Sequence, residues 1–247
     1  MKHYERLNEM RNEYTEILDT LCADYDFARA IFFFFSGDSV RCNWPEDEEA
    51  ACDLGLRYGG GATRMMVHKV GLPYVIKFTI EPKFGCDFCA DEINTYKQAE
   101  AAGVADIFAW CEFLMDYTFS DDGKERTVKV MIMEECECYE DNISGDTFNY
   151  HYNKFCKENG LEICDESREE FYDEGPDADC DDALLSYAVS TVGFSDKEQA
   201  QLLEVLDVCG VNDLHCGNWG YIGDRLVMID YAGYGRKNER DSYHEIW

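Results

Sequence analysis

Apolar residues recur at spacings of three and four along the first part of the chain. This period predicts an amphipathic helix over Tyr4–Leu21, with charged residues between the apolar positions facing solvent. A short apolar run follows at Ala30–Phe35, and its pattern does not distinguish a strand from the end of a buried helix. Behind Pro45, the acidic stretch Glu46–Cys52 is expected to be a short helix.

After residue 53 the pattern changes to short β-type runs separated by turn residues. The expected strands are Leu54–Tyr58, Arg64–Val70, Tyr74–Ile80, Ile107–Tyr117 and Thr127–Met133. Turn signals lie at Gly59-Gly60-Gly61, Gly71-Leu72-Pro73 and Ser120–Gly123. A helix over Asp91–Ala102 falls between the third and fourth strands. The first half therefore predicts a five-stranded antiparallel sheet with one inserted helix.

The second half is mainly helical. The expected helices are Tyr150–Glu158, Asp182–Val192 and Asp196–Val208, the last opened by a capping box of Ser195 and Glu198. A loop and a hairpin follow, with strands Trp219–Ile222 and Arg225–Ile229. We predict an α+β fold with a helical extension (1–53), a sheet lobe (54–135) and a reduced helical lobe (136–247).

Charge is the unusual global feature of the chain. Twenty-two Lys and Arg against 52 Asp and Glu give a net charge of −30. Such a field repels nucleic-acid phosphates and anionic membranes, so neither is an expected partner. The charge fits a solvated surface, and the alternatives are a nucleic-acid mimic or a surface that recognises a basic protein.

The 13 cysteines do not predict a disulfide framework, because their number is odd, the chain is long and no secretory signal precedes them. Reduced, mostly buried thiols in a cytoplasmic protein are the expectation. The pairs Cys86/Cys89 and Cys136/Cys138 leave a tetrahedral zinc site open as an alternative. No run approaches the ~20 apolar residues of a transmembrane helix.

The segment from Asp213 to Gly233 carries the strongest chemical signal. Asp213 and Asn218 lie at the ends of one loop, and Asp230 follows the apolar strand of the hairpin. Magnesium prefers oxygen donors, so one carboxylate and one amide beside substrate phosphates suit it. A second carboxylate can orient an acceptor hydroxyl and take its proton.

These residues resemble the protein kinase-like superfamily, particularly the aminoglycoside and choline phosphotransferase branch and small bacterial and phage kinase-like proteins. Asp213-Leu-His-Cys-Gly-Asn218 is similar to that branch's catalytic loop, and Ile229-Asp230-Tyr-Ala-Gly233 to its Asp-Phe-Gly element. The resemblance implies a two-lobed kinase-like fold, ATP and Mg²⁺ as cofactors, Asp213 as catalytic base, and Asn218 and Asp230 as metal ligands.

Further residues follow from the same resemblance. Lys77, among apolar residues on a strand, would hold the α- and β-phosphates of ATP with Glu92 on the next helix. Gly59, Gly60 and Gly61 would cover the phosphates with their backbone amides. Glu134 and Glu135 would form the hinge beside adenine. His215 would have a structural role, and Cys209 and Cys216 are expected to be packing residues.

The chain departs from the family pattern at two places. Val211-Asn212 stands where protein kinases carry His-Arg, and only 17 residues follow Asp230, fewer than a peptide-binding kinase lobe requires. We therefore expect an ATP/Mg-dependent phosphotransferase acting on an unidentified, small hydroxyl acceptor, which the region from Gly145 to Gly210 could help to bind. The alternative is an inactive kinase-fold module that binds nucleotide or a protein partner through its N-terminal helix or acidic surface.

Overall fold

The computed structural model describes residues 2–23, 56–60, 65–80, 88–121, 124–138, 152–160, 178–214 and 218–232. They form an α+β fold divided into two compact units. Unit 1 comprises Met1–Ala90 and Cys111–Glu134, and unit 2 comprises Asp91–Trp110 and Glu135–Trp247. The sequence-based division kept residues 54–135 together, whereas the structure groups Asp91–Trp110 with unit 2. The predictions for Ala30–Phe35 and Glu46–Cys52 lie outside the described residues.

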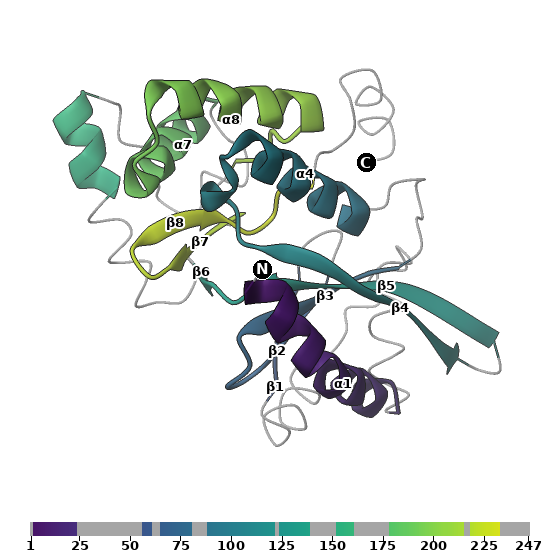
Figure 1. Ribbon diagram of the computed structural model, residues 1–247. Helices are drawn as coiled ribbons and strands as arrows, with labels where there is room; N and C mark the ends of the chain where they lie inside the picture. The colour runs from purple at the N-terminus through teal and green to yellow at the C-terminus, as the bar shows by residue number, and fades with distance from the viewer. Residues whose placement is uncertain are drawn as a thin grey trace. The chain divides into compact units, whose positions relative to one another are not determined.

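Unit 1 is built on the five-stranded antiparallel sheet that the sequence predicts. Its strands, in spatial order, are β1 (Leu56–Gly60), β2 (Met65–Lys69), β3 (Tyr74–Ile80), β5 (Lys124–Glu134) and β4 (Cys111–Asp121). The β2–β3 connection follows the predicted turn, with Gly71 at a φ of 92° and Leu72 N–H donating to the Lys69 carbonyl at 3.0 Å. The two short hairpins and the long β4–β5 hairpin (Figure 1) keep the sheet's pairing antiparallel.

Helix α1 (Lys2–Ala23) packs on the sheet of unit 1 (Figure 1). Its apolar stripe of Leu7, Tyr14, Ile17 and Leu18 is buried, which confirms the predicted amphipathic helix. The Tyr14 hydroxyl donates to the Tyr74 carbonyl at 3.4 Å. Arg11 donates to the carbonyl of Leu114, which lies at a bulge in edge strand β4. The apolar face of α1 is therefore used inside unit 1, and a partner that reached this helix would meet its charged face.

The run predicted as a strand over Ile107–Tyr117 starts differently in the structure. Ala105–Ile107 is a 3-10 turn, and β4 begins only at Cys111. Between them, the Ala109 N–H donates to the Met228 carbonyl at 2.9 Å, and Phe108 forms an isolated bridge with Met228. The apolar run gives no sign of this change because its residues are buried on every side.

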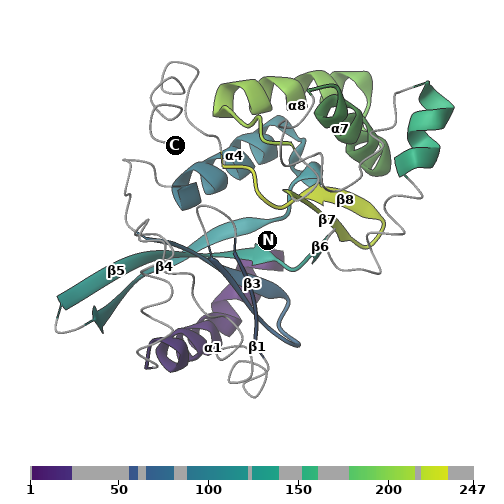
Figure 2. The same cartoon turned by 180° about the vertical axis from the view of Figure 1, so that it is seen from behind.

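Unit 2 holds a three-stranded antiparallel sheet of β6 (Glu137–Cys138), β7 (Trp219–Ile222) and β8 (Arg225–Met228). The predicted β7–β8 hairpin is confirmed, whereas the two-residue strand β6 was not expected. Helices α4 (Phe88–Ala102), α7 (Ala178–Val192) and α8 (Asp196–Cys209) lie on one side of this sheet (Figures 1 and 2), and residues 152–159 form a further helix.

Local signals set the boundaries of α8. The Ser195 hydroxyl accepts from the Glu198 N–H at 3.4 Å, and the Glu198 carboxylate accepts from the Ser195 N–H at 2.8 Å, as the predicted capping box requires. At the other end Gly210 adopts a φ of 69°, a left-handed conformation that glycine reaches without steric cost. Among the described residues, no helix is long and apolar enough to cross a membrane.

Candidate functional site

The loop that follows α8 begins the candidate site in unit 2. Beyond Gly210, the Val211 N–H bonds back to the Leu206 carbonyl at 2.9 Å, and the Val211 side chain is buried. The chain then leads to Asp213, which is partly exposed. Two residues at the start of the hairpin hold this loop: the Asn218 amide donates to the Asp213 carbonyl and the Trp219 indole to the Leu214 carbonyl, each at 2.9 Å.

Asn218 and Asp230 lie at the same end of the β7–β8 hairpin. Trp219 pairs with Met228, and the next backbone bond, from Ile229 N–H to the Asn218 carbonyl at 2.8 Å, continues the ladder by one step. Asn218 is buried, and Asp230 is partly exposed directly after the ladder ends. The hairpin therefore brings the two predicted metal ligands, 12 positions apart in sequence, beside each other.

Helix α4 supplies a buried carboxylate to the same segment. Glu92 is fully buried, and its Oε1 accepts the Tyr231 N–H at 3.0 Å. Tyr231 is itself buried, donates its hydroxyl to the Ala109 carbonyl at 2.6 Å and packs edge-on against Phe108 at 4.9 Å between ring centroids. The backbone just after Asp230 is thus held from two sides.

Three hydrogen bonds connect the segments that carry Glu92, Asp213, Asn218 and Asp230 within unit 2. They join Glu92 to Tyr231, Asn218 to Asp213, and Ile229 to Asn218, so that Asp230 lies between two bonded neighbours. Because the Asn218 NH₂ group is used on the Asp213 carbonyl, its oxygen Oδ1 is the atom suited to a metal ion. Asp213 and Asp230 add carboxylates on the two backbone segments that Asn218 bonds, and carboxylates are groups that can serve as hard donors or as a proton acceptor.

Lys77 belongs to unit 1 and is buried on β3. It pairs with Met66 of β2 and Met131 of β5. Successive side chains of a strand alternate between its faces, so Lys77 lies on the face opposite Tyr74, whose ring contacts Tyr14 of α1 at 6.4 Å between centroids. An ammonium group at such a position needs an anionic partner. The pairing of Lys77 with Glu92 would join the two units and stays a prediction.

The remaining predicted nucleotide residues also lie in the sheet region. Gly59 and Gly60 continue β1 and pair with Met66 and Met65, so the turn expected at Gly59-Gly60-Gly61 starts later than predicted. Glycine lacks a side chain that would mark which residue leaves the ladder, and Gly61 lies outside the described residues. Glu134 ends β5 opposite Tyr74, and Glu135 is exposed just beyond it.

The cysteines for which the sequence suggests a packing or metal-binding role differ in their surroundings. Burial raises the pKa of the Cys209 thiol, a hydrogen bond with Thr95 opposes this rise and the nearby Asp91 carboxylate adds to it, so this cysteine stays protonated at neutral pH, as a packing residue would. Cys89 is buried in α4 and Cys136 is partly exposed, while Cys86, Cys216 and His215 lie outside the described residues. Within the described part of the chain, no group of three or more His, Cys, Asp or Glu side chains is placed to hold a metal ion.

Comparisons with known proteins add no family assignment. No protein-family model matches the chain, and a search of curated proteins finds no match.

Sequence reasoning named Asp213, Asn218, Asp230 and Glu92 but did not assign a role to Tyr231. Its N–H donates to the Glu92 carboxylate and its hydroxyl donates to the Ala109 carbonyl, and these partners lie 139 and 122 positions away in sequence. No local pattern signals such contacts. An aromatic residue directly after the candidate metal ligand was the one clue that the sequence offered.

Proposed function

We propose that this protein is a kinase-like phosphotransferase that uses ATP and Mg²⁺ to phosphorylate a small hydroxyl-bearing acceptor. The observation that carries the proposal is the set of three hydrogen bonds that gathers Glu92, Asp213, Asn218 and Asp230 in unit 2. A fully buried carboxylate destabilises the fold unless it is hydrogen-bonded or paired with a charge. The Glu92 carboxylate accepts the N–H of Tyr231, the residue directly after Asp230.

In this proposal Asn218 Oδ1 and the Asp230 carboxylate would hold Mg²⁺, which neutralises the charge on the β- and γ-phosphates when bound. Asp213 would accept a hydrogen bond from the acceptor hydroxyl and take its proton as the oxygen attacks the γ-phosphorus. Lys77 would bind the α- and β-phosphates from the sheet of unit 1, as the family resemblance implies. The rest of the rate acceleration would come from positioning, because phosphoryl transfer depends more on alignment of the acceptor hydroxyl with the γ-phosphate than on covalent catalysis by the protein.

Thermal unfolding with magnesium alone, ATP alone and both together tests the metal–nucleotide site. A ligand at 100 times its dissociation constant adds about 2.7 kcal/mol to the free energy of unfolding. We expect wild type to show a raised midpoint when both are present, and Asp230→Ala to lose that rise. Asp224→Ala, an exposed change in the turn of the same hairpin, is the matched control and should respond as wild type does.

A turnover assay then separates an enzyme from an inactive module. ADP formation from ATP and Mg²⁺ is measured across a panel of small alcohols and amino alcohols. Asp213→Asn keeps the backbone carbonyl that Asn218 bonds, so it should retain the thermal response and lose turnover by at least roughly 100-fold. A thermal response without turnover in wild type would favour the nucleotide-binding module, and no response at all would refute the proposed site.

A further inference from the structure

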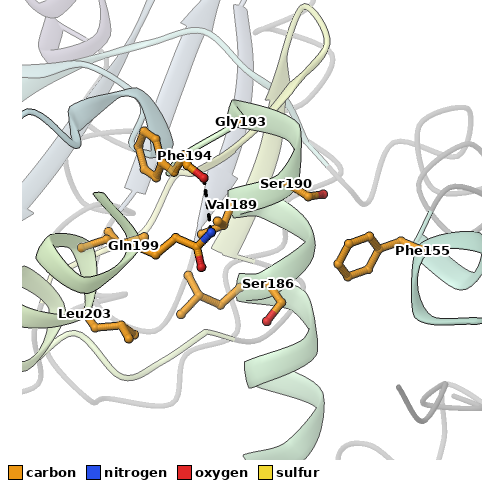
Figure 3. Close-up of a pocket in the computed structure, with 10 residues that line it drawn as sticks. Phe155, Ser186, Val189, Ser190, Gly193, Phe194, Gln199 and Leu203 are labelled. Carbon is orange, nitrogen blue, oxygen red and sulfur yellow. Dashed lines mark hydrogen bonds between the residues drawn. The ribbon is translucent and has the colours of Figure 1, made fainter. Parts of the chain in front are cut away.

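Unit 2 has a pocket of about 320 Å³ that the proposed phosphotransfer site does not use. It lies between the helix at residues 152–159, α7 and the N-terminal half of α8 (Figure 3). Phe155 faces α7 across the pocket, and Val189 and Leu203 contribute apolar walls. The Gln199 amide donates to the Phe194 carbonyl at 3.3 Å and fixes one end of the pocket.

The exposure of its lining makes this pocket a groove on the surface. Leu203 is 57% exposed, and Phe155 and Phe194 are each partly exposed. A pocket for a small ligand normally encloses most of its occupant, whereas an open apolar groove accepts one side chain of a larger partner. The lining therefore favours a macromolecular occupant.

The charge of α8 limits the chemistry of that occupant. α8 carries a net charge of −3 in sequence, and its Asp196, Glu204 and Asp207 are exposed together with one lysine, Lys197. The helix at residues 152–159 has two lysines, of which Lys154 lies 4.0 Å from Glu158, so the acidic side of the groove is formed by α8. Such a surface attracts a cationic chain and repels acidic segments and nucleic acid.

We propose that this groove binds a cationic, amphipathic helical segment of a partner protein. An apolar side chain of the partner inserts beside Leu203, and Lys or Arg residues on the partner's flanks lie near the carboxylates of α8. Apolar burial gives the contact its position, and the opposite charges select the partner and accelerate its association. This docking function is independent of the phosphotransfer site and can hold or fail separately from it.

The probe is a fluorescein-labelled amphipathic peptide of about 18 residues made of Leu and Lys, with a scrambled peptide of the same composition that forms no apolar face. Affinity is measured by fluorescence anisotropy at physiological salt on the whole 247-residue chain. Leu203→Gln removes the apolar wall and should weaken binding of the amphipathic peptide roughly tenfold. Leu203→Met, which keeps an apolar side chain, should bind as wild type does.

The chain offers a closely matched control on the same helix. Val208 is 58% exposed and does not line the pocket, so Val208→Gln makes a similar apolar-to-polar change at matched exposure and should alter affinity less than about twofold. Thermal unfolding checks that all three variants are folded. Equal weakening by Leu203→Gln and Val208→Gln would overturn the proposal, as would equal affinity for the scrambled peptide, which shows attraction by charge alone. Failure of the amphipathic peptide to bind wild type at about 100 μM would overturn it as well.

Discussion

Replacing Glu92 by alanine tests the contact that joins α4 to the segment after Asp230. The Glu92 carboxylate is fully buried and accepts the buried Tyr231 N–H at 3.0 Å. Loss of a hydrogen bond to a charged group costs about 1.5–3 kcal/mol, and the emptied space adds to that cost. We expect Glu92→Ala to lower the free energy of unfolding by about 3 kcal/mol, which for a chain of this size lowers the midpoint by about 6–12 °C.

The assay is thermal and urea unfolding followed by circular dichroism, with two companion variants. Glu92→Gln keeps the volume and an acceptor oxygen, so it should lose about 1 kcal/mol, less than the alanine variant does. Glu100→Ala removes an exposed carboxylate from the C-terminal half of the same helix and should be close to neutral. If Glu92→Ala unfolds at the same temperature as Glu100→Ala, the buried carboxylate does not hold the Tyr231 backbone, and the reasoning is wrong.

Two other changes test the packing of unit 2 and its response to pH. Tyr231→Phe removes the hydroxyl that donates to the buried Ala109 carbonyl and should lower the free energy of unfolding in urea by about 1–2 kcal/mol. The variant should still respond to ATP and Mg²⁺ as wild type does. An unchanged urea midpoint would contradict this. Two hydrogen bonds lower the pKa of Glu198: the larger effect comes from the Ser195 hydroxyl and the smaller from the Ser195 backbone N–H. The Glu198 carboxylate therefore stabilises the fold above its unfolded-state pKa, and this stabilisation is lost as pH falls through its folded-state pKa. Wild type should therefore exceed Glu198→Gln in unfolding midpoint at neutral pH and converge with it in acid, and a difference that stays constant with pH would count against the capping box as its cause.

Elements with a strong local signal were predicted closely. The strand Tyr74–Ile80 has the predicted bounds, because glycine and proline at residues 71–73 mark the preceding turn and the run that follows is apolar. Helix α8 has the predicted start because the capping box satisfies backbone donors within four residues. The helix at residues 152–159 and the β7–β8 hairpin follow from period and turn residues in the same way.

Elements that depend on distant partners were missed or misplaced. Strand β6 has two residues, and it is ordered by pairing with Tyr221 and Gly220 of β7, more than 80 positions later. The run at Ile107–Trp110 was predicted as the start of a strand, but its backbone bonds to Met228 instead of continuing the sheet of unit 1. Neither partner can be read from the local pattern.

For the candidate site, the sequence by itself determined the chemical groups: a carboxylate and an amide in one loop, a carboxylate after a strand, and a glutamate on a helix of the first half. Their identity and order are properties of the chain and need no fold to be seen. Only the tertiary structure decided that the Glu92 carboxylate accepts the Tyr231 N–H. It also decided that the Asn218 NH₂ group donates to the Asp213 carbonyl, which leaves Oδ1 as the atom of Asn218 suited to a metal ion. The physical reason is that hydrogen bonding and burial depend on distances in space, and Glu92 and Tyr231 meet across 139 positions of sequence.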